Sequence, residues 1–354
     1  KLADALNSRG TVTPALKSKK VFELLEELFT PEEAELATKM PLSSISAATL
    51  AKEIAGGDPK GVESLLETMA NKGLVTTRER DQVTVYSLMP LIPGIFEFQF
   101  MKGEVNDHAK KLARLFEDYF NVANQHMATA PTGFAAFPYF RVIPVEEEIP
   151  ADVEIHSYDR VSEYVTNSDH LAVSICYCRH HGELLGRPCD KPKDVCMTFG
   201  PQAKHVAERG FGRLVSKEEA LQILDRAEEA GLIHCSTNIG QYIDSICNCC
   251  DCHCPVIQSI KNAAVPSMAA ISSFVMTVNE EECTGCGACV DRCQMDALTM
   301  EGDIVVRSQE RCIGCGVCKS VCPTDALKLE PREGAPVPPS DRREFNAAMM
   351  SSLQ

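Results

Sequence analysis

The sequence predicts an α+β protein of several domains, and three observations support this fold class. The chain has 354 residues, 44% of them hydrophobic, so it can bury two or three separate cores. Its N-terminal part carries helix signals followed by a short hairpin pattern. All 18 cysteines lie at or after Cys176, in C-x-C and C-x2-C spacings that suit metal ligation in a reducing compartment.

The charge balance argues against general binding to nucleic acids or anionic lipids. Asp+Glu number 50 against 35 Lys+Arg, which gives a net charge of -15 and an acidic surface that repels phosphate. The longest uncharged run, residues 262–279, contains Pro266 and several hydroxyl residues, so it does not predict a membrane span. No signal peptide is visible, although a start at Lys1 leaves a removed leader open. We expect a cytoplasmic protein.

The N-terminal residues carry successive helix signals. Apolar residues recur at helical spacing over residues 21–29. Thr30, Pro31 and Glu33 combine an N-cap, a proline at the first helical position and a capping-box glutamate, so a new helix begins there. Two further helices are expected over residues 47–55 and 59–72.

A short hairpin is expected after these helices. Residues 74–77 and 83–86 read as two strands joined by a charged turn. Helices followed by such a hairpin resemble a winged helix-turn-helix domain, which implies DNA binding. However, residues 1–100 hold 11 Lys+Arg against 14 Asp+Glu, whereas a groove-reading domain normally presents a basic face. We therefore favour a module that docks another protein or its own chain.

The clearest motif is a doubled run of cysteines near the C-terminus. Each copy has the spacing C-x2-C-x2-C-x3-C and continues into Asp-Ala-Leu, and the second copy lies 29 residues after the first. The copies are Cys283, Cys286, Cys289 and Cys293, then Cys312, Cys315, Cys318 and Cys322.

This doubled motif resembles the bacterial two-cluster ferredoxin, which holds two [4Fe-4S] cubanes. In that family the fourth cysteine of each run binds the cluster of the other run. The resemblance therefore implies one cubane held by Cys283, Cys286, Cys289 and Cys322, and a second held by Cys312, Cys315, Cys318 and Cys293. Glycines within the runs allow the backbone to wrap each cluster. One departure is Gln294, which stands where the family usually has proline.

Two further cysteine groups precede this motif and are also expected to bind metal. The first is Cys176, Cys178, Cys189 and Cys196, and the second is Cys247, Cys249, Cys250, Cys252 and Cys254. Cys176 and Cys178 follow an apolar run that reads as a buried strand, which would point both thiols the same way. Cys250, Cys252 and Cys254 would do the same if that segment is extended.

We favour one or two further [4Fe-4S] clusters in this central region, with two preferred and zinc as the alternative. The preferred pairing keeps each group together, and leaves the isolated Cys235 and one residue of the second group unused. Three histidines lie among these cysteines, and we expect them to be supporting donors or solvent-facing residues. They are His180, His181 and His253.

The expected domains follow from these motifs. They are a winged-helix-like module (1–90), an aromatic-rich connecting region to which no site is assigned (91–170), a central cysteine-rich α/β region (171–277), a ferredoxin-like dicluster domain (278–330), and a Pro-rich linker and tail (331–354).

Chains that combine this ferredoxin motif with C-Y-C-R and C-N-C-C groups look like iron–sulfur proteins of anaerobes. No nucleotide-binding or hydrolytic motif is visible, so no catalytic residue is assigned. We expect an electron-transfer subunit that relays low-potential electrons to or from a flavoprotein or a catalytic oxidoreductase subunit. The alternatives are a reductase with an active-site cluster in the central region, and a redox-sensing winged-helix regulator.

Overall fold

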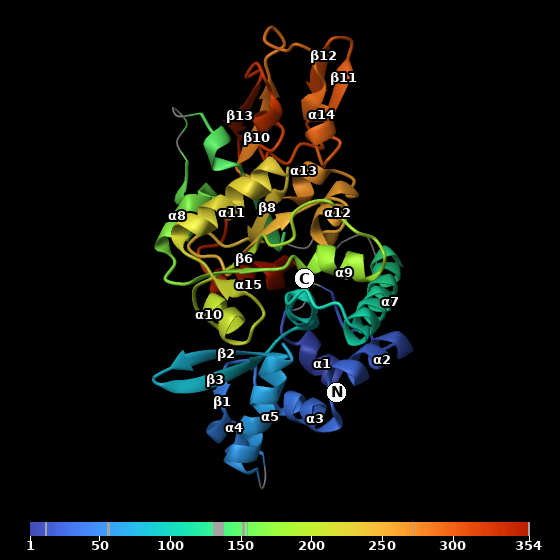
Figure 1. Cartoon of the computed structure of the whole chain (residues 1–354), viewed down its shortest axis with the longest axis vertical. Coiled ribbons are helices and arrows are strands. Elements are labelled where there is room, and N and C mark those ends of the chain that lie inside the picture. Colours follow the sequence, from blue (N-terminus) through green and yellow to red (C-terminus); the bar gives the residue numbers. More distant parts are fainter. Residues whose placement is uncertain are drawn as a thin grey trace. The chain divides into compact units, whose positions relative to one another are not determined.

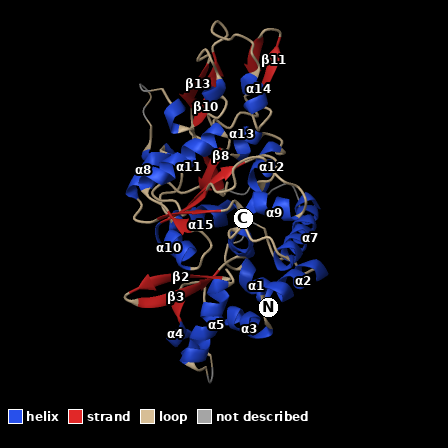
Figure 2. Cartoon of the chain, viewed as in Figure 1, coloured by secondary structure: helices blue, strands red, loops and turns tan. Residues whose placement is uncertain are grey.

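The computed structural model describes residues 1–10, 13–54, 57–129, 138–150, 153, 155–270 and 272–352. Helices and strands alternate through most of the chain (Figures 1 and 2). The chain divides into two compact units. Unit 1 comprises Lys1–Gly133, Ser174–Pro188 and Pro201–Leu214, and unit 2 comprises Phe134–Val173, Cys189–Gly200 and Val215–Gln354.

Unit 1 is mainly helical. Its helices are α1 (Leu2–Asn7), α2 (Lys19–Leu28), α3 (Pro31–Lys39), α4 (Ala47–Glu53), α5 (Pro59–Asn71), α6 (Phe96–Phe100), α7 (Asp107–Thr129), α9 (Tyr177–Leu184) and most of α10 (Gly200–Glu208). Its strands are β1 (Ile45–Ser46), β2 (Val75–Arg80), β3 (Val83–Leu88) and β7 (Arg213–Leu214). The first three form an antiparallel sheet in the order β1-β3-β2.

The local signals for these elements are confirmed. The Thr30 hydroxyl accepts a hydrogen bond from the Glu33 backbone N–H at 3.2 Å, and the Glu33 carboxylate accepts one from the Thr30 N–H at 2.8 Å. The predicted hairpin is present as β2 and β3. The expected end of the helix over 47–55 falls partly on residues 55 and 56, which lie outside the described residues.

Aromatic side chains form the centre of unit 1, as expected for a core. Phe96 makes edge contacts with Phe100 and Phe116 at centroid distances of 5.4 and 5.0 Å. It also contacts the His181 ring at 5.4 Å. These contacts join α6, α7 and α9. Residues 130–137, which belong to the same aromatic-rich stretch of sequence, lie outside the described part of the chain.

Unit 2 contains a central sheet and two smaller strand pairs. Its helices are α8 (Val161–Asn167), α11 (Lys217–Glu229), α12 (Pro255–Lys261), α13 (Pro266–Ala269), α14 (Ala288–Arg292) and α15 (Arg342–Ser352). The central strands are β4 (Phe140–Ile143), β8 (Ile233–Thr237), β9 (Ser245–Cys249), β6 (Cys196–Phe199) and β5 (Leu171–Ser174), in that order across the sheet. The pairs are β10 (Phe274–Val278) with β13 (Leu327–Pro331), and β11 (Leu298–Glu301) with β12 (Ile304–Arg307).

Alternate residues of β9 enter two different cores. Ile246 packs with Met197 of β6 and Ile223 of α11 on one face of the sheet. Cys249 belongs to the other core, together with Leu329 of β13. Because successive side chains on a strand point to opposite faces, this second face of the central sheet carries cysteines toward the C-terminal strands.

The C-terminal residues also pack on unit 2. Phe345 of α15 is buried, and its ring contacts that of Tyr139 at a centroid distance of 5.1 Å. The Gly240 backbone N–H donates to the Pro339 carbonyl at 2.8 Å. Across the described residues, every helix is too short or too polar to cross a lipid bilayer.

Candidate functional site

The first set of C-terminal cysteines lines one small cavity. Cys283, Cys286, Cys289 and Cys322 all border it, together with apolar side chains. This is the set that the ferredoxin resemblance implies for one cubane, with Cys322 contributed by the opposite run. Cys286 is exposed to solvent whereas Cys289 is buried, so one edge of the set reaches the protein surface.

The second set lies deeper in the module. Burial holds the pKa of Cys318 well above its ordinary value, and the nearby thiols Cys315 and Cys293 act in the same direction. Burial also raises the pKa of Cys315, where Cys293 and Cys312 contribute. Cys312 and Cys318 belong to the core that underlies the central sheet. Cys293 of the first run therefore lies among the three leading cysteines of the second run.

The repeated Asp-Ala-Leu segment shapes the turn after each fourth cysteine. The Ala297 backbone N–H donates to the Cys293 sulfur at 3.3 Å. At Cys322, burial alone would raise the thiol pKa, but backbone N–H groups of the same repeated turn, including that of Ala326, lower it below its ordinary value. Asp296 and Asp325 take left-handed φ values of 51° and 55°, which turn these N–H groups toward sulfur.

Two glycines allow the wrap that each run requires. A Cβ on Gly314 would lie 1.9 Å from the Phe274 carbonyl oxygen, and one on Gly285 would lie 2.4 Å from the Asp303 carbonyl oxygen. Both glycines also have positive φ values. No other residue fits these two positions without moving the backbone.

Gln294, the departure from the ferredoxin pattern, connects the dicluster module to the central region. It is buried, and its Oε1 accepts a hydrogen bond from the Asp251 backbone N–H at 2.6 Å. Its Nε2 donates to the Gly231 carbonyl and, at 3.4 Å, to the Cys249 carbonyl. A proline at this position could make none of these side-chain contacts, which gives the departure a physical reason.

Three cysteines of the central region gather around Cys249, and we call the four together the Cys249 group: Cys235, Cys247, Cys249 and Cys254. Cys235 of β8 pairs with Cys247 of β9 in the antiparallel register. Cys249 lies two residues further along the same face of β9. The Cys254 sulfur, at the N-cap of α12, lies 3.2 Å from the Cys249 sulfur.

The thiols of the Cys249 group are packed against one another. Contacts with Cys235, Cys247 and Cys254 hold the pKa of Cys249 well above its ordinary value. At Cys235 the contact with Cys249 is the largest influence and lowers the thiol pKa, but burial together with the charges of Cys254 and Cys247 outweighs it, and the net shift is upward. The raised pKa values of Cys235 and Cys249 favour the protonated thiols until a metal displaces the protons.

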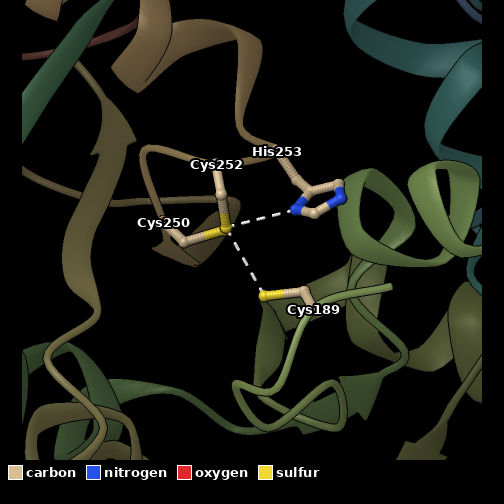
Figure 3. A group of neighbouring side chains, drawn as sticks. All are labelled: Cys189, Cys250, Cys252 and His253. Carbon is tan, nitrogen blue, oxygen red and sulfur yellow. Dashed lines mark hydrogen bonds between the residues drawn. The ribbon is translucent and has the colours of Figure 1, made fainter. Parts of the chain in front are cut away.

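A second compact set lies just beyond β9 and is shown in Figure 3. We call Cys189, Cys250, Cys252 and His253 the Cys189 group; their ligand atoms all lie within 4.8 Å of one another. The Cys252 sulfur lies 3.5 Å from that of Cys189 and 3.2 Å from Nδ1 of His253. Tetrahedral Zn²⁺ with bonds of about 2.3 Å to sulfur spaces two thiolates about 3.8 Å apart, so this set has the size of a single-ion site.

These placements differ from three expectations. The segment 250–254 is a turn, and it divides its cysteines between the two groups because Cys250 follows β9 directly while Cys254 caps α12. Cys189 lies with Cys250 and Cys252, so the preferred pairing within each sequence group is wrong for it. Cys235 is not isolated, because strand pairing brings it to Cys247.

Cys176 and Cys178 are not on a strand. The preceding strand β5 ends at Ser174, Cys176 is the N-cap of α9, and Cys178 lies in its first turn. Both thiols are buried within unit 1, and Cys196 is buried on β6 of unit 2.

His180 and His181, which follow these cysteines on α9, contact backbone carbonyls and are not solvent-facing. His180 Nε2 lies 2.9 Å from the Glu104 oxygen. His181 Nε2 lies 3.0 Å from the Ala113 oxygen. Both rings are buried, so these contacts anchor α9 within unit 1.

Comparison with known proteins identifies one segment of the chain. Residues 276–329 match the family model of the 4Fe-4S dicluster domain. No curated protein and no solved structure matches the chain. The match covers both cysteine runs, and it begins within β10 and ends within β13, the paired strands that enclose them. The C-terminal part of the chain is therefore a ferredoxin-like iron–sulfur module.

Proposed function

We propose that the chain is an iron–sulfur electron-transfer subunit that relays low-potential electrons through several [4Fe-4S] clusters. The observation that carries this proposal is the crossed arrangement of the two cysteine sets. One set, with Cys322 from the second run, reaches the surface at Cys286. The other set, with Cys293 from the first run, lies in the core beneath the central sheet. This arrangement places one cysteine set at the protein surface and the other in the interior of unit 2.

The residues present fit the clusters that the dicluster family implies. Each set offers four thiols, the number that a [4Fe-4S] cubane requires. Backbone N–H groups already point at the Cys293 and Cys322 sulfurs, where they stabilise thiolate charge and tune the potential of a bound cluster. The surrounding core buries Cys312 and Cys318 of the second set and partly covers Cys293 and Cys315. When bound, each cubane accepts and returns one electron.

The exposed edge near Cys286 supports a redox partner of opposite charge. Glu281, Glu282 and Asp303 are exposed close to this cysteine in the sequence or across the Gly285 contact. Together with the net charge of -15, they favour docking to a basic face, where charge mainly speeds encounter. We propose a flavoprotein or the catalytic subunit of an oxidoreductase as this partner.

We assign the zinc alternative to the Cys189 group. Three thiols and one imidazole form a recognised structural zinc set, and their spacing suits one ion. About one zinc per chain, lost on Cys189→Ala, is the expected result. Zinc that stays at the same level in that variant would refute this assignment.

Iron analysis tests the electron-transfer proposal directly. Anaerobically purified chain should contain at least about eight iron and eight acid-labile sulfide atoms, since the dicluster module alone accounts for that number. Dithionite should bleach its colour and produce the spin signal of reduced cubanes. Reoxidation by a one-electron dye should return the electrons. Protein that is colourless, or that keeps its iron but cannot be reduced, would refute the proposal.

A redox-sensing regulator is the second candidate. The observation that favours it is the three-stranded sheet β1-β3-β2 formed with helices α4 and α5, which resembles the winged helix-turn-helix arrangement expected from the sequence. The contacts of α5 oppose it. Glu67 of α5 binds Arg209 at 2.6 Å and accepts a hydrogen bond from Tyr86 at 2.7 Å. Arg209 also donates to Asn71 at 2.9 Å, so part of this helix is already occupied within unit 1. A gel-shift with genomic fragments at moderate salt should show no binding; a specific shift would favour the regulator.

A further inference from the structure

The Cys249 group is assembled by non-local contacts and has the composition of a cluster site. Its ligands come from β8, from β9 and from the start of α12. Cys235, Cys249 and Cys254 are at most 6% exposed, and Cys247 is half-buried. Four thiols are rarely gathered in a dry core for packing alone, because apolar side chains fill such space without a reactive sulfur.

The Cys249 group lies next to the dicluster module in the core of unit 2. Cys235, Cys249 and Cys254 share one continuous core with Cys312 and Cys318 of the second set, and with Cys289 of the first. The Cys235 thiol is close enough to Cys315 to contribute to the electrostatic environment of that residue. The Cys249 group therefore borders the buried set of the dicluster.

A direct bonded path joins the two sites. Gln294 follows Cys293 in the chain, and its side-chain amide contacts the Cys249 carbonyl at 3.4 Å. The same side chain accepts from the Asp251 N–H, which holds the turn between Cys249 and Cys254. This buried amide couples the position of a dicluster cysteine to that of the Cys249 group.

We propose that Cys235, Cys247, Cys249 and Cys254 hold a third [4Fe-4S] cluster, placed next to the buried cubane site of the dicluster. The inference rests on the proposed electron-transfer function and extends it, because it continues the series of centres from the surface at Cys286 into the central sheet. Binding releases the protons of the four thiols as their sulfurs coordinate iron. Four thiolates would also accept zinc, but a site bordering a redox cluster in the same core favours iron.

The test compares Cys235→Ala with Ser236→Ala in the full-length chain, purified without oxygen. Ser236 is a matched control, because it is also buried on β8 and its side chain lies on the opposite face of the strand, where its hydroxyl donates to the Ser245 carbonyl at 2.9 Å. Cys235→Ala should lose about four iron and four sulfide atoms relative to the wild type, while the spin signal of the reduced dicluster remains. Ser236→Ala should keep the wild-type iron content.

Three results would overturn the inference while leaving the dicluster intact. Iron could be equal in Cys235→Ala and the wild type, or zinc rather than iron could be lost, or the loss could also occur in Ser236→Ala. Cys247→Ser decides the matter if Cys235→Ala does not fold, because Cys247 is less buried. Wild-type protein without any iron would instead refute the proposed function itself.

Discussion

Cys235 on β8 lies directly opposite Cys247 on β9 in the antiparallel register of the central sheet. Side chains that oppose each other on one face of such a pair have Cβ atoms about 4.5–5.5 Å apart. Cys249 continues the same face and contacts Cys254. Strand pairing in the sheet thereby brings cysteines that are distant in sequence together in one group, which shares a core with the dicluster module.

Replacing Gln294 by proline, the residue usual in two-cluster ferredoxins, should weaken the Cys249 group and spare the dicluster. The change removes the side-chain hydrogen bonds to Asp251, Gly231 and Cys249. We expect a loss of about 2–4 kcal/mol in the free energy of unfolding, from three buried hydrogen bonds. Chemical denaturation measures this loss, and iron analysis follows the clusters. Gln258→Ala is the control, because that side-chain amide is exposed and its hydrogen bond to the Cys252 carbonyl, at 3.0 Å, lies at the surface.

Gly314→Ala should prevent the second cysteine run from holding its cluster. The added Cβ would lie 1.9 Å from the Phe274 carbonyl oxygen, so strand β10 or the loop must move. Gly302→Ala is the control, because Gly302 has a similar positive φ of 63° with nothing within 4 Å of an added Cβ. The control should cost only about 1 kcal/mol of backbone strain. Equal iron content in the two variants would contradict the steric explanation.

His205 should make unit 1 less stable in mild acid. Its Nδ1 accepts a hydrogen bond from the Thr77 backbone N–H at 3.2 Å, and burial, followed by the charge of Arg209, lowers its pKa to about 4. The unfolded chain has the ordinary value of 6.5, so it binds the proton first. The contribution of neutral His205 to the free energy of unfolding is therefore complete above about pH 6.5. It falls by up to about 3 kcal/mol as the pH decreases to 4.

Urea denaturation between pH 7.5 and pH 4.5, followed by a probe in unit 1, measures this effect. His205→Gln keeps a side-chain acceptor near Thr77 and removes the titrating group. The variant should lose most of the pH dependence over this range. A wild-type curve that stays flat between pH 6.5 and 4.5 would contradict the assignment of a neutral, buried His205.

The ion pair between Arg141 and Asp159 should be costly to break, because it is buried. Arg141 lies on the strand next to the one that carries Cys235. Arg141 lies on β4, and both side chains are at most 2% exposed. Arg141→Met should cost about 3–5 kcal/mol, because it leaves the Asp159 carboxylate buried without its partner. The double variant with Asp159→Leu should recover much of this loss. Thermal unfolding of the single and the double variant measures both losses of stability. If the two variants lose the same amount, packing rather than charge dominates.

The dicluster module could be predicted from the sequence because its ligands are local. Within each run, the spacing of Cys283, Cys286 and Cys289 fixes how tightly the backbone must wrap, and the family model matches this segment. The helix cap at Thr30 is equally accessible from sequence, since it depends on two residues three positions apart. Local patterns of this kind can be recognised without knowledge of the tertiary structure.

The central cysteines could not be grouped from sequence because their grouping depends on strand order. Cys235 meets Cys247 only through the β8–β9 register, and Cys189 meets Cys252 only after the chain has passed through β6, α11 and the central sheet. The strand expected to lead into Cys176 ends at Ser174, two residues before it, and helix α9 begins at Tyr177. The alternation of apolar and polar residues around Cys235 was the one signal that it belonged to a strand face.

Iron and acid-labile sulfide per chain, measured on protein purified without oxygen, test the central claim most directly. We predict about eight atoms of each from the dicluster module and about four more of each from the Cys249 group. The colour should bleach on reduction. A colourless preparation in which zinc occupies the thiols and sulfide is absent would contradict the account.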